Sequence, residues 1–326
     1  MTCDPDIDAA RQTALALLCA DAPDPALFDP AVVAWLPAPL DRARGLAALQ
    51  ARLFGPLLRA FGTTRIAPEI LIADRYAGSI WVAAMGVLRS DQSAPYLGVP
   101  PGRNRALRFG VFLRVDQARI REMRVLFDLP RLSADAGIDL LPPFAGRPDM
   151  PPPPRDGAGL NLSARPNEDS MLTRDLVSSL IGGLNQLKGG RLSTMPQRDF
   201  WDDDMRWYGP WGVGACHGFE EYQRFAQGPS VASFPDRRGT WPKDAFVAEG
   251  RVAAFTGWPS LVGTFSGAPF RGIPPTGGPI GQNIMDFYLR RGDRLLENWV
   301  FIDLIGFALQ CGVDLMAPLG TSVTER

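Results

Sequence analysis

The chemistry open to this chain is limited by its few nucleophilic and metal-binding side chains. Its 326 residues contain one histidine, His217, and four cysteines, none of which forms a Cys-x-x-Cys pair. A Ser-His-Asp or Cys-His mechanism would have to use His217 as its base, and a histidine-rich metal site is excluded. Catalysis is therefore expected to depend on carboxylates, Tyr, Lys or a bound cofactor.

A strand-like segment that contains a glutamate and an aspartate occurs twice in the sequence. Residues 294–303 have an earlier copy at 118–128, and a gapless alignment places Asp128 on Asp303, 175 positions apart. Matches elsewhere keep nearly the same offset, which chance would not do. The other matched pairs include Glu122 with Glu297, Gly98 with Gly272, Gly45 with Gly218 and Phe61 with Phe234. The sequence therefore predicts two tandem copies of one domain.

The two copies differ in their aromatic content. Trp299 is answered by Arg124 in the first copy, and Trp207 by Ala34. Six of the eight tryptophans lie in the second copy. Any single tryptophan is more often core than pocket, but their concentration in one copy favours a pocket there. The six are Trp201, Trp207, Trp211, Trp241, Trp258 and Trp299.

Hydrophobic periodicity predicts helices and strands in both copies. The segment 21–30 is expected to be a connection, and the acidic run 202–204 a solvated turn. The predicted helices are 6–20, 45–61, 168–184 and 218–226. The predicted strands are 66–73, 79–89, 106–115 and 119–128 in the first copy, and 244–248, 251–257, 260–265, 280–290 and 294–303 in the second.

A proline-rich stretch marks the boundary between the copies. Residues 142–166 hold eight prolines, four of them consecutive at 151–154, and such a run is extended and stiff. We therefore expect a degenerate domain at 1–145, a linker at 146–166, and a second domain at 167–326 with the likelier pocket.

Composition excludes several classes of partner. The formal net charge is −1, which argues against a nucleic-acid-binding surface. No run of eighteen apolar residues is present, so no membrane span is expected. The N-terminus is acidic where a signal peptide would be basic, and a cytoplasmic location is expected.

Several motifs of the second copy give the sequence a family resemblance. It resembles the SnoaL-like polyketide cyclases, members of the nuclear transport factor 2-like superfamily that also holds ketosteroid isomerases and limonene epoxide hydrolases. The motifs are Met205-Arg-Trp-Tyr-Gly-Pro-Trp-Gly-Val-Gly214, Phe234-Pro-Asp-Arg237, Thr256-Gly-Trp-Pro-Ser260, Gly272-Ile-Pro-Pro-Thr-Gly277, Met285-Asp-Phe-Tyr-Leu-Arg-Arg-Gly-Asp-Arg294 and Glu297-Asn-Trp-Val-Phe-Ile-Asp303. The resemblance covers residues 168–320 and is weaker in the first copy.

The resemblance implies the fold and the kind of ligand. The expected fold class is α+β, with two tandem cones, each a strongly curved, mostly antiparallel sheet wrapped against helices. A small hydrophobic molecule is the implied ligand, and no cofactor and no metal are expected. Members commonly pair through their sheets, so the two copies are expected to form an intramolecular pseudo-dimer. A homodimer of whole chains is also compatible with the family.

Asp303 is the first catalytic candidate that the resemblance suggests. Enzymes of this superfamily transfer protons next to a carbonyl, or activate water, with a carboxylate whose pKa is raised by burial. Asp303 ends the family's Glu-x-Trp-x-x-x-Asp strand and shares a face with Trp299 and Phe301. The alternative is that Asp303 caps the helix that follows, as Asp128 would in the first copy.

Asp286 is the second catalytic candidate. It matches the position from which ketosteroid isomerases present a buried acid to a substrate oxygen. The alternative is a solvent-facing residue paired with Arg290 or Arg294. A simple hairpin about Gly292 puts Asp286 and Asp303 on opposite faces of the sheet, whereas a bulge would reverse this.

His217 is the third candidate, at the start of the predicted helix 218–226. A helix N-terminus lowers the pKa of a histidine and leaves it neutral. The alternative is a surface or capping histidine. The family often carries a histidine three residues after the Asp303 position, where this chain has Gly306, so a mechanism that relies on that histidine is in doubt.

Aromatic residues of the second copy are predicted to line the pocket. Substrate binding is assigned to Trp207, Tyr208, Trp258, Phe287 and Trp299. The function favoured by the resemblance is cofactor-free acid/base catalysis on a hydrophobic carbonyl compound, by aldol cyclisation, isomerisation or hydration. The alternative is a non-catalytic binding or scaffolding protein with the same fold, because this superfamily often loses catalysis and keeps its pocket.

Overall fold

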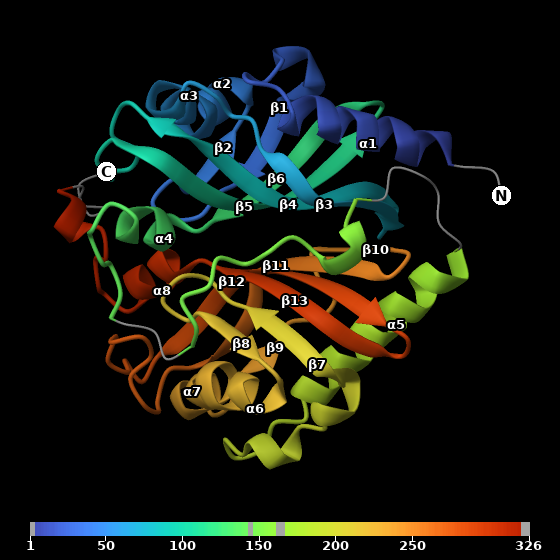
Figure 1. Cartoon of the computed structure of the whole chain (residues 1–326), viewed down its shortest axis with the longest axis vertical. Helices are drawn as coiled ribbons and strands as arrows, with labels where there is room; N and C mark the ends of the chain where they lie inside the picture. Colours follow the sequence, from blue (N-terminus) through green and yellow to red (C-terminus); the bar gives the residue numbers. More distant parts are fainter. Residues whose placement is uncertain (1–3, 143–145, 161–166, 321–326) are drawn as a thin grey trace. The chain divides into compact units, whose positions relative to one another are not determined.

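The computed structural model describes residues 4–142, 146–160 and 167–320, which divide into two compact units (Figure 1). Unit 1 comprises Met1–Leu140, Arg155–Ala164 and Met316–Arg326, and unit 2 comprises Leu141–Pro154 and Arg165–Leu315. The proline-rich segment is therefore divided between them. Its residues 146–154 belong to unit 2, and residues 155–160 belong to unit 1.

Among the described residues, unit 1 holds a six-stranded sheet with the order β2-β1-β6-β5-β4-β3. Every pair is antiparallel except β1 with β6, which is parallel. The longest strands are rich in the β-branched and aromatic residues that favour a pleated surface. The strands are β1 (Phe28–Trp35), β2 (Arg42–Arg44), β3 (Ala67–Tyr76), β4 (Ser79–Gln92), β5 (Gly102–Asp116) and β6 (Arg119–Phe127).

The helices of unit 1 pack on this sheet. Asp4 accepts hydrogen bonds from two backbone N–H groups and so begins α1, whose buried face contacts β3 and β4. Asp128 caps the short helix that follows β6. The helices are α1 (Pro5–Leu18), α2 (Leu46–Leu49), α3 (Gly55–Phe61) and α4 (Leu129–Ala134).

The described part of unit 2 repeats this design with seven strands. The order is β10-β11-β12-β13-β7-β8, with the two-residue β9 paired to β11, and β13 with β7 is the parallel pair. Glycine at position 292, with φ of 61°, lets β12 turn into β13. The strands are β7 (Trp201–Tyr208), β8 (Ala215–His217), β9 (Arg238–Gly239), β10 (Ala245–Glu249), β11 (Val252–Thr264), β12 (Pro279–Arg291) and β13 (Arg294–Ile302).

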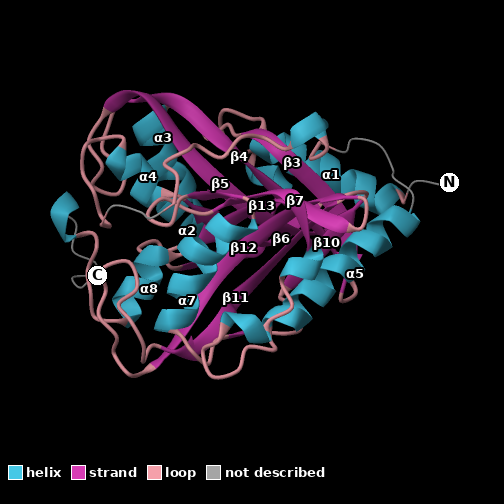
Figure 2. Cartoon of the chain, turned by 60° about the horizontal axis from the view of Figure 1, so that its bottom comes forward, coloured by secondary structure: helices cyan, strands magenta, loops and turns pink. Residues whose placement is uncertain are grey.

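Helices cover one face of the unit 2 sheet. Helix α5 contacts β10 and β11, while α6 and α7 lie on the same side of the sheet (Figures 1 and 2). Helix α8 follows β13 and contacts β12. The helices are α5 (Asn167–Leu184), α6 (Phe219–Glu221), α7 (Gly228–Ser233) and α8 (Leu304–Gln310).

The same irregular helix occurs in both units. A π-helical stretch, Gln50–Phe54 in unit 1 and Tyr222–Gln227 in unit 2, runs directly into a Gly-Pro pair. Proline has no N–H to donate, which disturbs the α-helical ladder at that point. An added Cβ at Gly55 or Gly228 would lie 2.9 or 2.8 Å from a carbonyl oxygen of the preceding turn, so both units need glycine here.

The observed elements confirm the predicted fold class and correct three details. Both units are α+β with a curved, mostly antiparallel sheet. Strand β1 occupies part of the segment 21–30 that was predicted as a connection, and the run 202–204 lies within β7 and is not a turn. The predicted strands 251–257 and 260–265 are one strand, β11, which changes register between Gly257 and Leu261. Asp29-Pro30 in β1 and Asp202–Asp204 in β7 interrupt the apolar alternation of these strands, which explains why β1 and β7 were missed.

None of the described helices combines the length and the apolar composition needed to cross a lipid bilayer.

Candidate active site

A cavity of about 130 Å³ lies within unit 2, between its sheet and its helices. Its walls come from α5, from the π-helical segment before α7, and from strands β7, β11, β12 and β13. Most of the lining is apolar, and the side chains with polar groups come from the sheet, from the loops beside it and from the helical wall. These polar residues are Asn185, Tyr222, Gln227, Ser230, Arg237, Arg238, Lys243, Ser260, Arg271, Gln282, Asp286, Tyr288 and Asn298.

Asp286 is the carboxylate of this cavity. It lies on β12, and the Tyr288 hydroxyl and the Asn298 side-chain amide both donate to its Oδ1, each at 3.3 Å. None of the described residues donates to Oδ2. The arrangement holds the carboxylate by one oxygen and leaves the other available to a bound molecule.

The surroundings of Asp286 change its acidity. The side chain keeps partial solvent access because it faces the cavity, while protein atoms enclose it on the other sides. Burial disfavours the charged form and raises the pKa of Asp286 to about 6, against the lowering effect of Asn298, Lys243 and Tyr288. A carboxyl group of this pKa accepts and releases protons near neutral pH.

Lys243 places a second ionisable group in the cavity. It precedes β10, is 4% exposed, and donates from Nζ to the backbone oxygen of Ser260 at 3.0 Å and to its Oγ at 2.8 Å. The ammonium also lies 4.5 Å from the centre of the Phe255 ring, within cation–π range. Burial lowers the pKa of Lys243 to about 8, and the charge of Asp286 opposes this effect.

A row of three hydrogen-bonded side chains follows the helical wall of the cavity. Arg237 donates to the Gln227 amide oxygen, and the Gln227 amide nitrogen donates to the Tyr222 hydroxyl. The ring of Tyr222 packs against Trp201 and Trp207, with centroid distances of 5.4 and 5.9 Å. The aromatic packing fixes Tyr222, and the Gln227 bridge relates its position to that of Arg237.

Asp303 does not line the cavity. It forms the N-cap of α8, where its Oδ1 accepts from the Gly306 N–H at 2.8 Å, and the Asn283 amide donates to its Oδ2 at 3.4 Å. An added Cβ at Gly306 would lie 2.4 Å from Asp303 Oδ2, so a histidine at this position would require the cap to move. Of the two roles considered for Asp303, the structure therefore supports the helix cap.

Asp286 and Asp303 lie on opposite faces of the sheet. Asp286 pairs with Val300 after a register shift between Leu289 and Arg290, and it shares its face with Asn298. The next residues along β13 alternate, so Trp299 points away from the cavity. The expectation that a bulge would bring the two carboxylates to one face is wrong. The bulge is present and separates them, because the unshifted register set by the Arg291–Arg294 pair would place Asp286 opposite Trp299, on the face of Asp303.

Three of the predicted substrate-binding aromatics belong to that other face. Trp299 stacks on Tyr208 with a centroid distance of 5.7 Å, and its indole N–H donates to the backbone oxygen of Pro152. Phe287 is paired with Trp299 across the strands and packs on Phe301. All three predicted residues are buried within unit 2 outside the cavity lining.

The other two predicted aromatics, Trp207 and Trp258, differ in their position relative to the cavity. Trp207 lines the cavity, next to Asn298 on the neighbouring strand. Trp258 does not line it and lies at the irregular point of β11, where its backbone N–H donates to Asp244 at 2.6 Å. Only Trp207 of the five predicted aromatics lies in the cavity wall.

His217 lies outside the cavity lining as well. It ends β8, its Nε2 lies 3.6 Å from a carboxylate oxygen of Asp149, and its backbone N–H donates to Glu221 at 2.8 Å. Burial and the charges of Arg206 and Arg147 lower the pKa of His217. The N-cap of α6 is Gly218, so His217 fits the surface alternative and has no place in proton transfer at Asp286.

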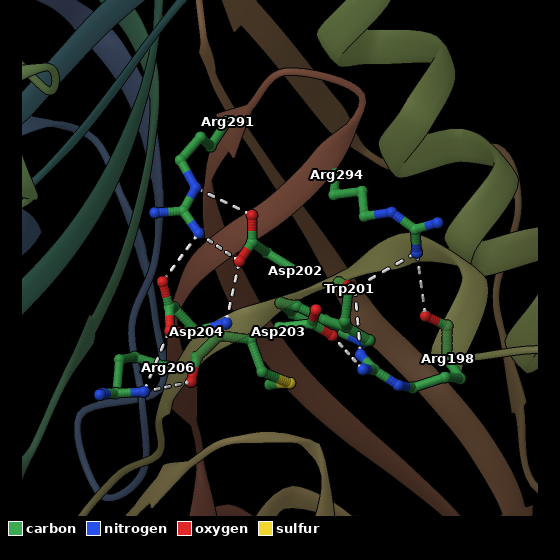
Figure 3. Close-up of polar contacts among 9 residues, drawn as sticks. Arg198, Trp201, Asp202, Asp203, Asp204, Arg206, Arg291 and Arg294 are labelled. Atoms are coloured by element: carbon green, nitrogen blue, oxygen red, sulfur yellow. Dashed lines mark hydrogen bonds and ion pairs between the residues drawn. The ribbon is translucent and has the colours of Figure 1, made fainter.

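The acidic run 202–204 forms ion pairs at the edge of unit 2 (Figure 3). Arg291 lies between Asp202 and Asp204. Its Nε donates to Asp202 at 2.9 Å, and its Nη2 donates to Asp204 at 2.9 Å. Arg198 pairs with Asp203. These carboxylates are neutralised by neighbouring arginines and do not form a metal site. Among the residues that the structure describes, no group of three or more metal-binding side chains is found.

Sequence reasoning missed most of the polar groups in the cavity. Tyr288 follows Asp286 by two positions, so the alternation of a strand alone places it on the same face. Asn298 required the register of the β12–β13 hairpin. Lys243 and Arg237 lie in loops, where no periodic signal marks a side chain that turns inward.

Part of unit 2 is similar in sequence to a known family. Residues 191–311 match the model of the SnoaL-like polyketide cyclase family. This match confirms the resemblance seen in the motifs of unit 2.

Comparison with solved structures finds many similar chains. IdmH from Streptomyces antibioticus, provisionally called a polyketide cyclase, is 26% identical over 43% of this chain and 99% of its own, with a TM-score of 0.35. TsrD from Streptomyces laurentii is 23% identical over 43% and 96%, with a TM-score of 0.34. A protein from Jannaschia sp., provisionally called a SnoaL-like polyketide cyclase, is 17% identical over 46% and 97%, with a TM-score of 0.37. No curated protein matches the chain.

Proposed function

We propose that unit 2 is a cofactor-free acid/base enzyme that moves a proton next to the carbonyl group of a small hydrophobic compound. The observation that carries the proposal is Asp286, a cavity carboxylate with a pKa of about 6 and one oxygen without a donor among the described residues. Aldol cyclisation and isomerisation both begin with this proton transfer.

Each polar group near Asp286 has a place in the proposed reaction. Asp286 Oδ2 takes a proton from the carbon next to the substrate carbonyl, while Tyr288 and Asn298 hold Oδ1 and fix the direction of the carboxylate. The carbonyl oxygen gains negative charge as the proton leaves. Lys243 supplies a positive charge in the same cavity, which lowers the energy of the enolate.

The apolar part of the cavity supports the same chemistry. Side chains such as Ile181, Leu184, Phe255 and Ile284 exclude water from the reacting carbon. In these surroundings the charges of Asp286 and Lys243 interact more strongly than they would in water. A volume of about 130 Å³ is close to that of a protein cavity known to accept a single aromatic ring.

The proposal is tested by deuterium exchange at the carbon next to a carbonyl. Purified protein is incubated in D₂O with a panel of single-ring aromatic ketones and small cyclic enones, and NMR measures the loss of the proton signal. Wild type is expected to accelerate exchange for part of the panel. Asp286→Asn is expected to lower the rate by about 10²- to 10⁴-fold, the usual contribution of a positioned acid/base group.

Asp303→Asn is the matched control for this experiment. It makes the same change of carboxylate to amide, and asparagine is as good an N-cap as aspartate, so exchange should stay at the wild-type rate. If Asp286→Asn exchanges as fast as wild type, Asp286 is not the base. Ligands that bind equally to both proteins without exchange would identify unit 2 as a binding protein.

A further inference from the structure

One positively charged side chain of the cavity has no partner of opposite charge among the described residues. Arg237 has five N–H donors, and in the described part of the chain its side chain donates only to the neutral amide oxygen of Gln227. Its Nε–H is buried with no acceptor among those residues. A buried guanidinium normally has a carboxylate partner, because removing its charge from water is costly.

The rest of the lining has the same excess of positive charge. Arg237, Arg238, Lys243 and Arg271 line the cavity, whereas Asp286 is the acidic side chain among its described lining residues. Asp286 acts on the pKa of Lys243. Asp286 is not among the groups that act on the pKa of Arg237, so the charge of Arg237 is not balanced by the carboxylate of the proposed reaction.

A second orphan donor lies in the same wall. The side-chain amide nitrogen of Gln282 has no hydrogen-bond partner in the described residues, although Gln282 is only 3% exposed. Buried amides are almost always hydrogen-bonded, so an unmade bond here indicates a group that the protein chain does not supply. Gln282 and Asp286 lie on the same face of β12, four residues apart.

The matching wall of unit 1 shows that the fold does not require these donors. At the offset of 173 positions, Arg237 corresponds to Thr64 and Gln227 to Phe54, and both of these residues line the small apolar space inside unit 1. At the offset of 175 positions, Gln282 corresponds to the buried Leu107. The basic and amide groups are a property of the unit 2 cavity alone.

We infer that the substrate of unit 2 carries a carboxylate, which Arg237 binds, in addition to the carbonyl group presented to Asp286. The guanidinium retains free donors for two carboxylate oxygens, and charge-assisted bonds of this kind are the strong ones. The row from Arg237 through Gln227 to Tyr222 holds the guanidinium in place before the ligand arrives. This inference rests on the proposed function for the reacting end of the molecule and adds the chemistry of its other end.

The test compares two probes that differ only in charge. The first is 4-acetylbenzoate, an aromatic ketone with a carboxylate, and the second is its neutral amide, 4-acetylbenzamide. Binding to the full chain is measured by isothermal titration calorimetry at pH 7.5. Wild type should bind the acid at least about tenfold more tightly than the amide, since hydrogen bonds to a charged group typically give this preference. Equal affinity for the two, or no binding of the acid at millimolar concentration, would overturn the inference.

Variants locate the preference. Arg237→Gln should reduce the acid-to-amide ratio to near one while affinity for the amide changes little. Arg238→Gln removes the same charge from another residue of the lining and should keep most of the preference. If both variants reduce the ratio equally, the preference comes from the total positive charge of the cavity lining, and Arg237 is not the group that binds the carboxylate. Melting curves check that each variant is folded, and the wild-type comparison stands without them.

Asp286→Asn separates this inference from the proposed reaction. Removing the negative charge from the cavity should leave the acid preference intact or increase it. Failure of the exchange assay with an intact acid preference would refute proton transfer and keep carboxylate binding. Exchange without any acid preference would do the opposite.

Discussion

Asp286 of unit 2 and Val111 of unit 1 occupy the same place in two sheets of the same design. Asp286 pairs with Val300 and Val111 with Val125, and the members of each equivalent pair are 175 positions apart. Val111 faces a space of about 20 Å³ closed by apolar side chains, whereas Asp286 faces a cavity of about 130 Å³. One scaffold therefore supports both a filled interior and an open polar one.

The two units also differ at a second position of the interior wall, but they agree at the N-cap of the helix that follows the last strand. Asn298 corresponds to Met123, and both line the interior of their unit. Asp303 and Asp128, by contrast, are the same residue with the same role, each accepting a backbone N–H three residues later, at 2.8 and 3.2 Å. What the copies share is structural, and what only unit 2 has is the candidate chemistry.

The largest effect is expected when the acid is placed in unit 1. Val111→Asp should destabilise unit 1 by about 3 kcal/mol or more, because the closed apolar space offers the charge neither water nor a donor. Urea unfolding measures the loss, with Val111→Ala as the control for lost volume. A fully stable Val111→Asp would show that unit 1 also has room and partners for a carboxylate.

Removing the acid from unit 2 by Asp286→Asn should raise its stability by an amount that depends on pH. The pKa of Asp286 rises from 3.8 in the unfolded chain to about 6, so the folded state binds the proton more tightly and loses stability as pH rises through this range. Asp286→Asn should therefore gain stability relative to wild type between pH 4 and pH 6, by up to about 3 kcal/mol. Denaturant unfolding at several pH values measures the gain, and a constant difference between the two proteins would contradict the assigned pKa.

The shared caps should respond alike in the two units. Asp303→Ala and Asp128→Ala each remove one side-chain acceptor at a helix start and should each cost about 1 kcal/mol of unfolding free energy. Neither change should alter proton exchange by unit 2. A loss of exchange in Asp303→Ala at full stability would return Asp303 to the catalytic candidates.

The smallest effect is expected from a change at Lys243, the positively charged neighbour of Asp286. The charge of Lys243 lowers the pKa of Asp286, so Lys243→Met should move it above about 6. The pH profile of deuterium exchange should then shift to higher pH, and its maximal rate should fall because the enolate loses its positive neighbour. An unchanged profile would mean that the two groups do not interact.

The sequence alone predicted the fold and only part of the site. The repeat and the alternating strands were visible in the chain, and the family motifs named the fold. Asp286 was a candidate because of its position in the family motif. Asp303 was ranked above it, since a residue at the end of a strand serves equally as a pocket acid or a helix cap until the register is known.

Register explains the remaining differences between sequence and structure. The two-residue turn at Gly292 pairs Arg291 with Arg294, and a shift beyond Leu289 then pairs Asp286 with Val300. The turn and the shift together place Trp299 on the outer face, where residues 146–154 of the same unit reach it through Pro152. Neither the bulge nor the loop residues Lys243 and Arg237 have a periodic signature that a sequence could reveal.

The central claim is that Asp286 is a carboxyl group tuned for proton transfer in unit 2. Its direct test is a ¹³C NMR titration of the Asp286 side chain in protein labelled at the aspartate carboxyl carbons, with the signal assigned by its absence from Asp286→Asn. We predict a titration midpoint of about 6, with the carboxylate form present above it. A midpoint near the ordinary aspartate value of about 4 would contradict the account, because the cavity would then not have tuned the acidity of Asp286.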